Sequence, residues 1–295
     1  MAEGGTNRVT FFSKKETVCP VDGSRFFREE ILTGRGRLIA GNLNNELRRM
    51  YEPSVKYGKI SPLLYPITVC PGCYYAALAS DFQNVPEASL PELENGVEER
   101  VQAVQKVLGE LDFHEPRNTA EGAASYLLAL MSYDAFPKEF SPVVKQGICS
   151  LRAAWMFNDL HTESPMDNYD YIAKLFYRKA AFFYDLALEY ETAGKQSITD
   201  VAHLGPDLDQ NYGYDGVLYL SSYLTLHHGA REDEEYRNKS LSQAKTTAAK
   251  LFGMGKASKQ KPSAILDKAR DLYALISEEL SDEEADSGEA EDDET

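Results

Sequence analysis

Hydrophobic positions recur at three- and four-residue spacing over most of the chain after residue 86, which is the period of an amphipathic helix. The same pattern predicts helices over residues 92–111, 119–133, 141–160, 168–191, 216–227, 234–252 and 262–280. In the longest of these segments, 168–191, the apolar positions are Ile172, Leu175, Phe176, Ala180, Phe183, Tyr184, Ala187 and Leu188. Short polar links join the segments, so we expect a body of antiparallel helices with no strand between them.

Small and aromatic residues alternate in two of these predicted helices. Ala180 and Ala187 alternate with Phe183 and Tyr184, and a similar set ends the helix at 234–252. Tetratricopeptide (TPR) helix pairs pack small residues against aromatic ones in this way, although a complete repeat cannot be aligned throughout. Residues 86–280 are therefore predicted to form a TPR-like helical domain.

The pattern before residue 86 is different and favours strands and turns. Residues 6–18 are predicted to be extended, and the glycine-containing stretch 24–67 is predicted to form hairpins and loops, with a helical turn at 45–50. Ile67, Thr68 and Val69 are a β-branched run typical of a strand, and it ends directly before Cys70. The fold class expected is mainly α, with a small β-rich module at 1–85 before the helical domain.

Two look-alike segments in this module carry candidate metal ligands. They are Cys19-Pro-Val-Asp22-Gly23 and Cys70-Pro-Gly-Cys73-Tyr74. Each resembles a zinc knuckle, in which two ligands three positions apart fold around one metal through a tight turn. Cys19, Cys70, Cys73 and the carboxylate of Asp22 would complete a tetrahedral set for one structural zinc ion. The module is accordingly predicted to be zinc-ribbon-like.

Three alternatives remain open for these residues. Cys70 and Cys73 also fit a thioredoxin-type redox dithiol, with the apolar stretch 75–79 as the helix that stabilises the first thiolate. A second alternative is a degenerate site that has lost its metal together with the fourth cysteine, in which Asp22 makes only an Asx-turn to its own backbone. The third alternative is a catalytic zinc with an open fourth position, for which no nearby general base is evident.

Acidic residues are concentrated at the end of the chain. The net charge is −16, but 281–295 hold nine acidic side chains and no basic one, so residues 1–280 carry −7. A segment of one charge sign without aromatic residues is expected to be a disordered acidic tail. The mildly acidic body argues against delocalised binding to nucleic acid or to anionic membranes.

Targeting signals are also missing from the sequence. The first fifteen residues contain no apolar core of a signal peptide, and the apolar stretch 123–131 is too short to span a bilayer. The chain has four cysteines, and three of them lie near Pro and Gly in the two look-alike segments. This pattern favours metal binding over disulfide formation and is consistent with a reducing compartment. We therefore expect a cytoplasmic protein that does not enter membranes.

The order of these motifs resembles the bacterial family DUF2225, over nearly the whole chain except the tail. The resemblance rests on the two knuckles, Ser61-Pro-Leu-Leu-Tyr65, Leu151-Arg-Ala-Ala-Trp155 and the helices around 219–226 and 236–252. The family pattern would place Cys at Asp22 and Gly at Tyr74. The resemblance implies a zinc-binding module followed by TPR-like helices, and it implies no activity.

The function expected from these features is a non-enzymatic, zinc-binding adaptor that binds a protein partner or peptide on its helical surface. Candidate contact residues are Tyr169, Tyr171, Tyr177, Arg178 and Tyr212. One alternative is nucleic-acid binding through a basic segment that contains Arg25, Arg28, Arg35, Arg37, Arg48 and Arg49, with Phe26 and Phe27 interleaved. A CxxC redox protein or a metal hydrolase is a further alternative.

Overall fold

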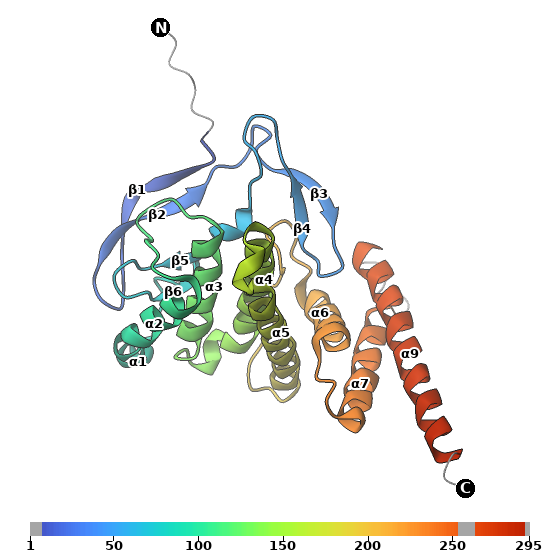
Figure 1. Ribbon diagram of the computed structural model, residues 1–295. Helices are drawn as coiled ribbons and strands as arrows, with labels where there is room; N and C mark the ends of the chain where they lie inside the picture. Colours follow the sequence, from blue (N-terminus) through green and yellow to red (C-terminus); the bar gives the residue numbers. More distant parts are fainter. Residues whose placement is uncertain (1–7, 253–262, 293–295) are drawn as a thin grey trace.

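Helices make up most of the chain, and they stand side by side in chain order (Figure 1). The computed structural model describes residues 8–252 and 263–292, so 1–7 of the predicted module, 262 of the last predicted helix and 293–295 of the predicted tail lie outside it. The α-helices in the described residues are α1 (Leu90–Asn95), α2 (Val97–Leu108), α3 (Thr119–Tyr133), α4 (Pro142–Glu163), α5 (Tyr169–Thr192), α6 (Gly213–His228), α7 (Glu234–Phe252) and α9 (Ser263–Asp292). The mainly helical class is confirmed.

The helix boundaries follow local signals in the sequence. The bounds of α3 and α7 are those predicted, and α3 begins with a capping box formed by Asn118 and Glu121. The prediction of one helix over 92–111 was wrong. Gly96 separates α1 from α2, and Gly109, at φ +77°, ends α2 because a left-handed residue cannot continue a helix. Helix α9 reaches Asp292 and so overlaps the segment 281–295.

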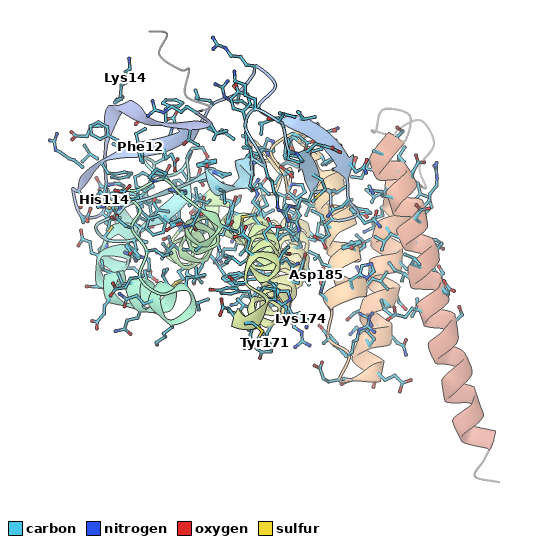
Figure 2. All side chains as sticks on the ribbon, turned by 45° about the horizontal axis from the view of Figure 1, so that its top comes forward. Phe12, Lys14, His114, Tyr171, Lys174 and Asp185 are labelled. Carbon is cyan, nitrogen blue, oxygen red and sulfur yellow. The ribbon has the colours of Figure 1, made fainter. Side chains whose placement is uncertain are left out.

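Each long helix packs against the next one along the chain, from α3 through α7 to α9, and α9 also contacts α6. Helix α4 is at the centre, between α3 and α5, and large side chains such as Trp155 and Phe157 are fully buried on it. Side chains fill the space between the helices (Figure 2). In the described part of the chain, no helix combines the length and the apolar character needed to cross a bilayer.

Three antiparallel hairpins precede the α-helices; the first two lie across one end of the array, and the third lies beside α3 (Figure 1). They pair β1 (Thr10–Val18) with β2 (Arg25–Ile31), β3 (Ile39–Leu43) with β4 (Arg49–Glu52), and β5 (Ile67–Val69) with β6 (Ala76–Leu78). Hairpins were expected here, and so was the strand before Cys70. Strands β5 and β6 pack on α3, and one hydrophobic core is continuous from the hairpins to the helices.

The helical turn predicted at 45–50 was wrong, since this segment forms the turn of the β3–β4 hairpin and the first two residues of β4. The Asn44 side chain accepts hydrogen bonds from the backbone N–H groups of Glu46 (3.0 Å) and Arg48 (2.8 Å), which fixes the turn locally. Leu47 closes it at φ +58° and is completely buried. A left-handed leucine is costly, so the burial of its side chain must offset the backbone strain.

Candidate metal centre

The turns of the β1–β2 and β5–β6 hairpins have the same backbone hydrogen bonds. We name residues 19–24 the first knuckle and residues 70–75 the second knuckle. In each, the N–H of the opening cysteine donates to the carbonyl of the closing residue, and the N–H before that closing residue donates back to the cysteine carbonyl. The four distances are Cys19–Ser24 2.8 Å, Gly23–Cys19 3.0 Å, Cys70–Tyr75 2.8 Å and Tyr74–Cys70 3.0 Å. Two segments that look alike in sequence therefore form one type of turn.

Both knuckles place a residue in the left-handed region at the same position. Gly23 adopts φ +74° at no steric cost, whereas Tyr74 adopts φ +57°. The Tyr74 hydroxyl donates to the Leu111 carbonyl (3.0 Å), and its ring meets the ring of Phe113 edge-on at 5.3 Å. These contacts fix the second knuckle to the segment after α2 and offset the strain at Tyr74.

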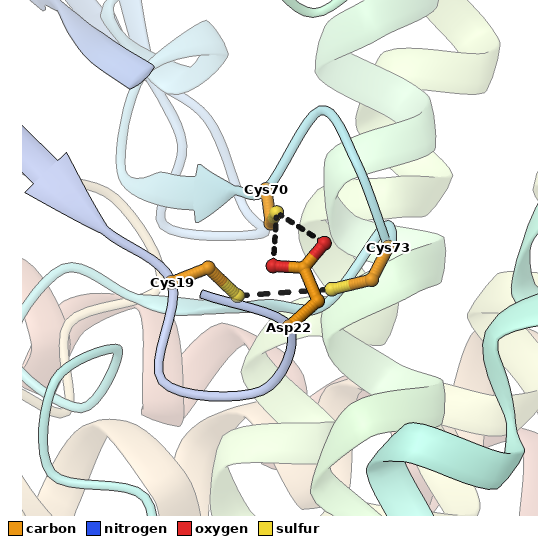
Figure 3. A group of neighbouring side chains, drawn as sticks. All are labelled: Cys19, Asp22, Cys70 and Cys73. Carbon is orange, nitrogen blue, oxygen red and sulfur yellow. Dashed lines mark hydrogen bonds between the residues drawn. The ribbon is translucent and has the colours of Figure 1, made fainter. Parts of the chain in front are cut away.

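The four predicted ligands come together where the two knuckles meet (Figure 3). One ligand atom from each of Cys19, Asp22, Cys70 and Cys73 lies within 4.8 Å of all the others. The Cys19 and Cys73 sulfurs are 3.7 Å apart, and the Cys70 sulfur is 3.5 Å from Asp22 Oδ1. With Zn–S of about 2.3 Å and Zn–O of about 2.0 Å, a tetrahedron has edges of about 3.8 Å and 3.5 Å. The side chains thus fit a four-coordinate metal ion.

A disulfide needs sulfurs about 2.05 Å apart, whereas the Cys19 and Cys73 sulfurs are 3.7 Å apart and are therefore not disulfide-bonded. All three cysteines are free and buried, while Asp22 is exposed. The pKa of Cys70 is lowered because its sulfur accepts hydrogen bonds from Cys19 and then Cys73, and the pKa of Cys19 is raised by its bonds to Cys70 and then Cys73. Sulfurs this close repel one another when all are ionised, so a bound cation would stabilise the cluster.

Asp22 is oriented by the first knuckle itself. Its Oδ1 accepts from the Ser24 backbone N–H (3.0 Å), and its Oδ2 accepts from the Ser24 hydroxyl (2.6 Å). The Asx-turn of the degenerate alternative is therefore present, but the same carboxylate also lies 3.5 to 3.7 Å from the Cys70 sulfur. The turn and metal ligation are compatible.

Gly72 has no side chain, and the Asp22 carboxylate occupies the space that a side chain at this position would need. A Cβ at residue 72 would lie 2.5 Å from Ser24 Oγ and 2.6 Å from Asp22 Oδ2. Gly72→Ala should displace the carboxylate and weaken metal binding at the cluster by about 10- to 100-fold, the usual effect of disturbing a ligand's support. Competition titration with a chromophoric chelator measures this. In an Asp22→Ala background the same change should cost much less, and an equal cost there would contradict the explanation.

Arg100 supports the second knuckle, although it belongs to none of the motifs recognised in the sequence. Its guanidinium is buried and donates to the Cys73 carbonyl from Nε (3.2 Å) and Nη2 (3.0 Å), and to the Leu93 carbonyl from Nη2 (2.7 Å). Helix α2 thereby holds the turn that carries Cys73. The only sequence signal is that Arg100 lies between Leu93 and Val104, which are also buried on this part of the chain.

The structure removes the support for the redox alternative. That alternative needs a helix directly after Cys73, whose N-terminus would stabilise a thiolate. The stretch after Cys73 instead leads into strand β6, which is antiparallel to β5, with Leu78 opposite Ile67. The dithiol is thus located in a hairpin turn between two strands.

Most of the predicted basic segment is neutralised by acidic neighbours. Its ion pairs are Arg25–Glu16 (2.9 Å), Arg28–Glu30 (2.6 Å), Arg48–Asp159 (2.5 Å) and Arg49–Asp209 (2.7 Å). Phe26 is buried against Phe82, while Phe27 is exposed. Paired arginines release fewer counterions on binding a phosphate backbone, so this surface is less suited to nucleic acid than its composition indicates.

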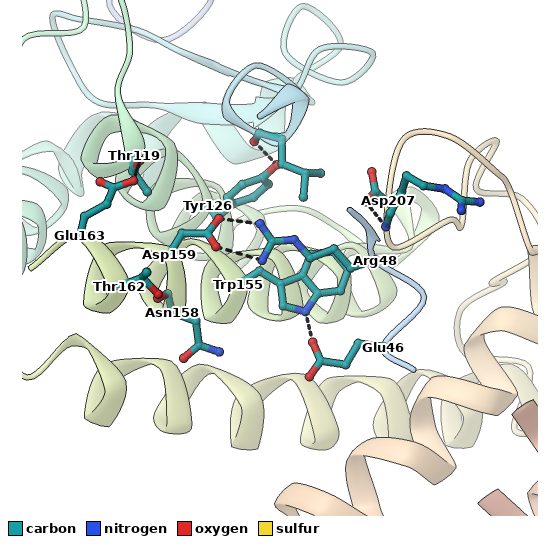
Figure 4. A network of polar contacts seen from close by, with 12 residues as sticks. Glu46, Arg48, Thr119, Tyr126, Trp155, Asn158, Asp159, Thr162, Glu163 and Asp207 are labelled. Atoms are coloured by element: carbon teal, nitrogen blue, oxygen red, sulfur yellow. Dashed lines mark hydrogen bonds and ion pairs between the residues drawn. The ribbon is translucent and has the colours of Figure 1, made fainter. Parts of the chain in front are cut away.

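A second group of polar residues joins the β3–β4 turn to the helices (Figure 4). The partly buried carboxylate of Glu46 accepts hydrogen bonds from the indole N–H of Trp155 and from the Tyr177 hydroxyl (3.0 Å to Oε2). Arg48 pairs with Asp159 and lies over the Trp155 ring, 5.4 Å from its centroid. Tyr177, which we predicted as a partner contact, is thus a buried packing residue here.

The fold and the site together define a mainly helical protein with an N-terminal cluster of three cysteines and one aspartate that can hold a metal ion. The chain belongs to the family described as an uncharacterized protein conserved in bacteria (DUF2225), whose model matches residues 12–276. An uncharacterized protein of Borreliella burgdorferi (strain B31) is 44% identical over 273 residues, which cover 92% of this chain and 98% of the relative. No solved structure matches the chain. The family resemblance seen in the motifs is confirmed.

Proposed function

We propose that Cys19, Asp22, Cys70 and Cys73 hold one structural zinc ion in a non-enzymatic protein-interaction adaptor. The observation that carries the metal assignment is the meeting of four ligand atoms within 4.8 Å, with separations close to the edges of a zinc tetrahedron. Soft thiolates favour zinc over magnesium or calcium. All four positions are taken by protein groups, so the zinc ion would have no open position for a substrate or water.

The proposed zinc ion would act as a crosslink between two hairpins. A two-stranded hairpin is only marginally stable alone. The β1–β2 hairpin is only partly buried, and Val18 and Phe27 are among its exposed side chains. Through Cys19 and Asp22, zinc would tie it to the second knuckle, which packs on α3. Metal binding would then supply stability that this part of the chain lacks.

The adaptor part of the proposal depends on the helical array. Helices that pack in chain order leave surface hollows between neighbours, as TPR-like stacks do. One such hollow, of about 370 Å³, lies among α5, α6 and α7 and includes Arg178 in its lining. Arg178 is exposed and was predicted as a partner contact, whereas Tyr212 is buried. A surface of this kind suits a peptide or a side chain of a partner protein.

The role of Asp22 can be tested by substitutions at this one position. Protein purified without chelator should contain one zinc ion per chain by elemental analysis. Asp22→Cys, which restores a four-thiolate set, should bind zinc at least about tenfold more tightly, and Asp22→Ala should lose about 10- to 100-fold. Equal affinity of Asp22→Ala and the unchanged chain would reduce Asp22 to a turn residue, and the absence of zinc from all three proteins would reject the metal assignment.

The adaptor function needs a separate measurement. The tagged chain should be cross-linked in cells of a bacterium that produces it, and the cross-linked proteins identified by mass spectrometry. We expect reproducible partners whose cross-links map to α5, α6 and α7. Cross-links no more frequent than those of an unrelated tagged protein would reject the adaptor.

A further inference from the structure

The hollow among α5, α6 and α7 is lined by charged and aromatic side chains. Helix α5 contributes one face to it through Arg178, Phe182, Asp185 and Glu189, which are three or four residues apart. The end of α6, the following link and the start of α7 form the other walls. Its volume of about 370 Å³ is within the range of sites that take a small ligand or a large side chain.

Asp185 lines this cavity and lies on the side of α5 that faces α6 (Figure 2). Its Oδ1 accepts from the Ser221 hydroxyl (2.6 Å), and its Oδ2 accepts weakly from the Thr225 hydroxyl (3.4 Å). Solvent reaches the carboxylate, although the surrounding protein raises its pKa through desolvation. Two hydroxyls thus fix the carboxylate, and each oxygen keeps a lone pair for a ligand.

The charges around Asp185 leave it without a cation. Among the described residues, no Lys, Arg or His lies within ion-pair distance of its carboxylate, whereas the other charged groups of the cavity are paired: Arg178–Glu232 (3.8 Å) and Glu189–Lys195 (3.7 Å). His228 stacks on Tyr177 at 4.1 Å, and burial lowers its pKa to about 4, so it is neutral near pH 7. The cavity therefore has a net negative charge that a cationic ligand would neutralise.

Two aromatic side chains give this cavity apolar walls. Phe182 is 60% exposed and Tyr236 is 58% exposed, although both line the cavity. Exposed aromatic faces beside a carboxylate suit a guanidinium, which is planar, weakly hydrated, and able to stack on a ring while it pairs with a carboxylate. A lysine ammonium offers no flat face for such stacking.

We propose that this cavity binds an arginine side chain of a partner protein. The guanidinium would pair with Asp185, and its plane and aliphatic stem would lie against Phe182 and Tyr236. The inference rests on the proposed adaptor function and specifies its partner: a segment with an accessible arginine.

A peptide probe tests the recognition directly. The probe is a fluorescein-labelled heptapeptide with blocked ends and one central arginine between leucines, and its control has neutral citrulline in place of arginine. By fluorescence anisotropy, the full chain should bind the arginine peptide at least about tenfold more tightly than the citrulline peptide, since a hydrogen bond to a charged group is at stake. Equal affinities would overturn the proposal.

Matched variants on α5 locate the effect. Asp185→Asn keeps the shape and an acceptor for Ser221, and it should weaken the arginine peptide at least about tenfold while leaving the citrulline peptide unchanged. Phe182→Ala should weaken both peptides. Asp170→Asn, an exposed aspartate of the same helix that pairs with Lys174 at 3.1 Å, should change neither. Unchanged binding by Asp185→Asn, with an unchanged thermal midpoint, would overturn the proposal.

Two further outcomes separate this inference from its alternatives. Agmatine, a free guanidinium compound, should compete only at concentrations well above that of the peptide, and equal potency would reassign the cavity to small organic cations and overturn the partner-protein proposal. The cross-linking experiment distinguishes failure of the cavity from failure of the adaptor. Partners that cross-link equally to the unchanged chain and to Asp185→Asn would leave the adaptor standing and reject the arginine site.

Discussion

Cys73→Ser is expected to abolish binding of the proposed zinc ion and to unfold the two knuckles. Cys73 is buried and lies 3.7 Å from Cys19. Serine is a poor zinc ligand, so we expect zinc affinity to fall by at least about 100-fold, which is about 2.8 kcal/mol. Elemental analysis measures the zinc, and hydrogen exchange of the amides in 10–31 and 67–78 measures the loss of hairpin structure.

Cys149→Ser is the matched control for this prediction. Cys149 is also a free, completely buried cysteine, but it lies in α4 away from the cluster. The control should lose stability through a buried hydroxyl while it keeps one zinc ion per chain. Equal zinc content in Cys73→Ser and Cys149→Ser would contradict the role of Cys73. Unchanged hairpin protection after zinc removal by chelator would contradict the structural role of the metal.

The features that could be predicted most accurately from the sequence are those determined by residues close together in the chain. The two knuckles could be recognised because each uses Pro and Gly around its ligands within a few residues, and the bounds of α3 and α7 followed from periodic apolar positions. The segment 45–50 was wrongly predicted to be helical because so short a segment has the same pattern in a helical turn and in a hairpin turn. The turn is fixed by hydrogen bonds to the Asn44 side chain and by Leu47, which is buried in the hydrophobic core that the hairpins share with the helices.

The rest of the site depends on long-range packing that a single sequence does not encode in a readable pattern. Arg100 looks like a surface residue of a charged helix, and only the position of α2 beside the second knuckle makes it a support for Cys73. Arg48 and Arg49 looked like part of a basic patch, but Asp159 and Asp209 neutralise them from segments more than a hundred residues away. Pairing of this kind can be seen only in the fold.

Glu46→Ala is expected to destabilise the folded chain strongly, because Glu46 joins the β3–β4 turn to α4 and α5. It would leave the Trp155 indole N–H and the Tyr177 hydroxyl buried without their acceptor. Each unsatisfied group costs about 1–3 kcal/mol, so we expect a loss of roughly 3 kcal/mol in the free energy of unfolding. Urea denaturation measures it. Glu52→Ala, an exposed glutamate of β4, should stay within about 0.5 kcal/mol, and equal losses for the two variants would contradict the proposed anchoring of the turn.

Comparison with Glu46→Gln gives the pH dependence of this anchor. Burial raises the pKa of Glu46 in the folded chain, although Tyr177, Trp155 and Arg48 oppose the shift. Between the unfolded and the raised folded pKa, the folded state binds more protons than the unfolded state, so stability falls as pH rises. The free energy of unfolding of the unchanged chain minus that of Glu46→Gln should therefore decrease above about pH 4.5, by at most about 1.4 kcal/mol per pH unit, and level off above the folded pKa. Effects of pH on the zinc cluster are common to both proteins and cancel. An increase with pH would mean that Tyr177, Trp155 and Arg48 outweigh the burial of the carboxylate.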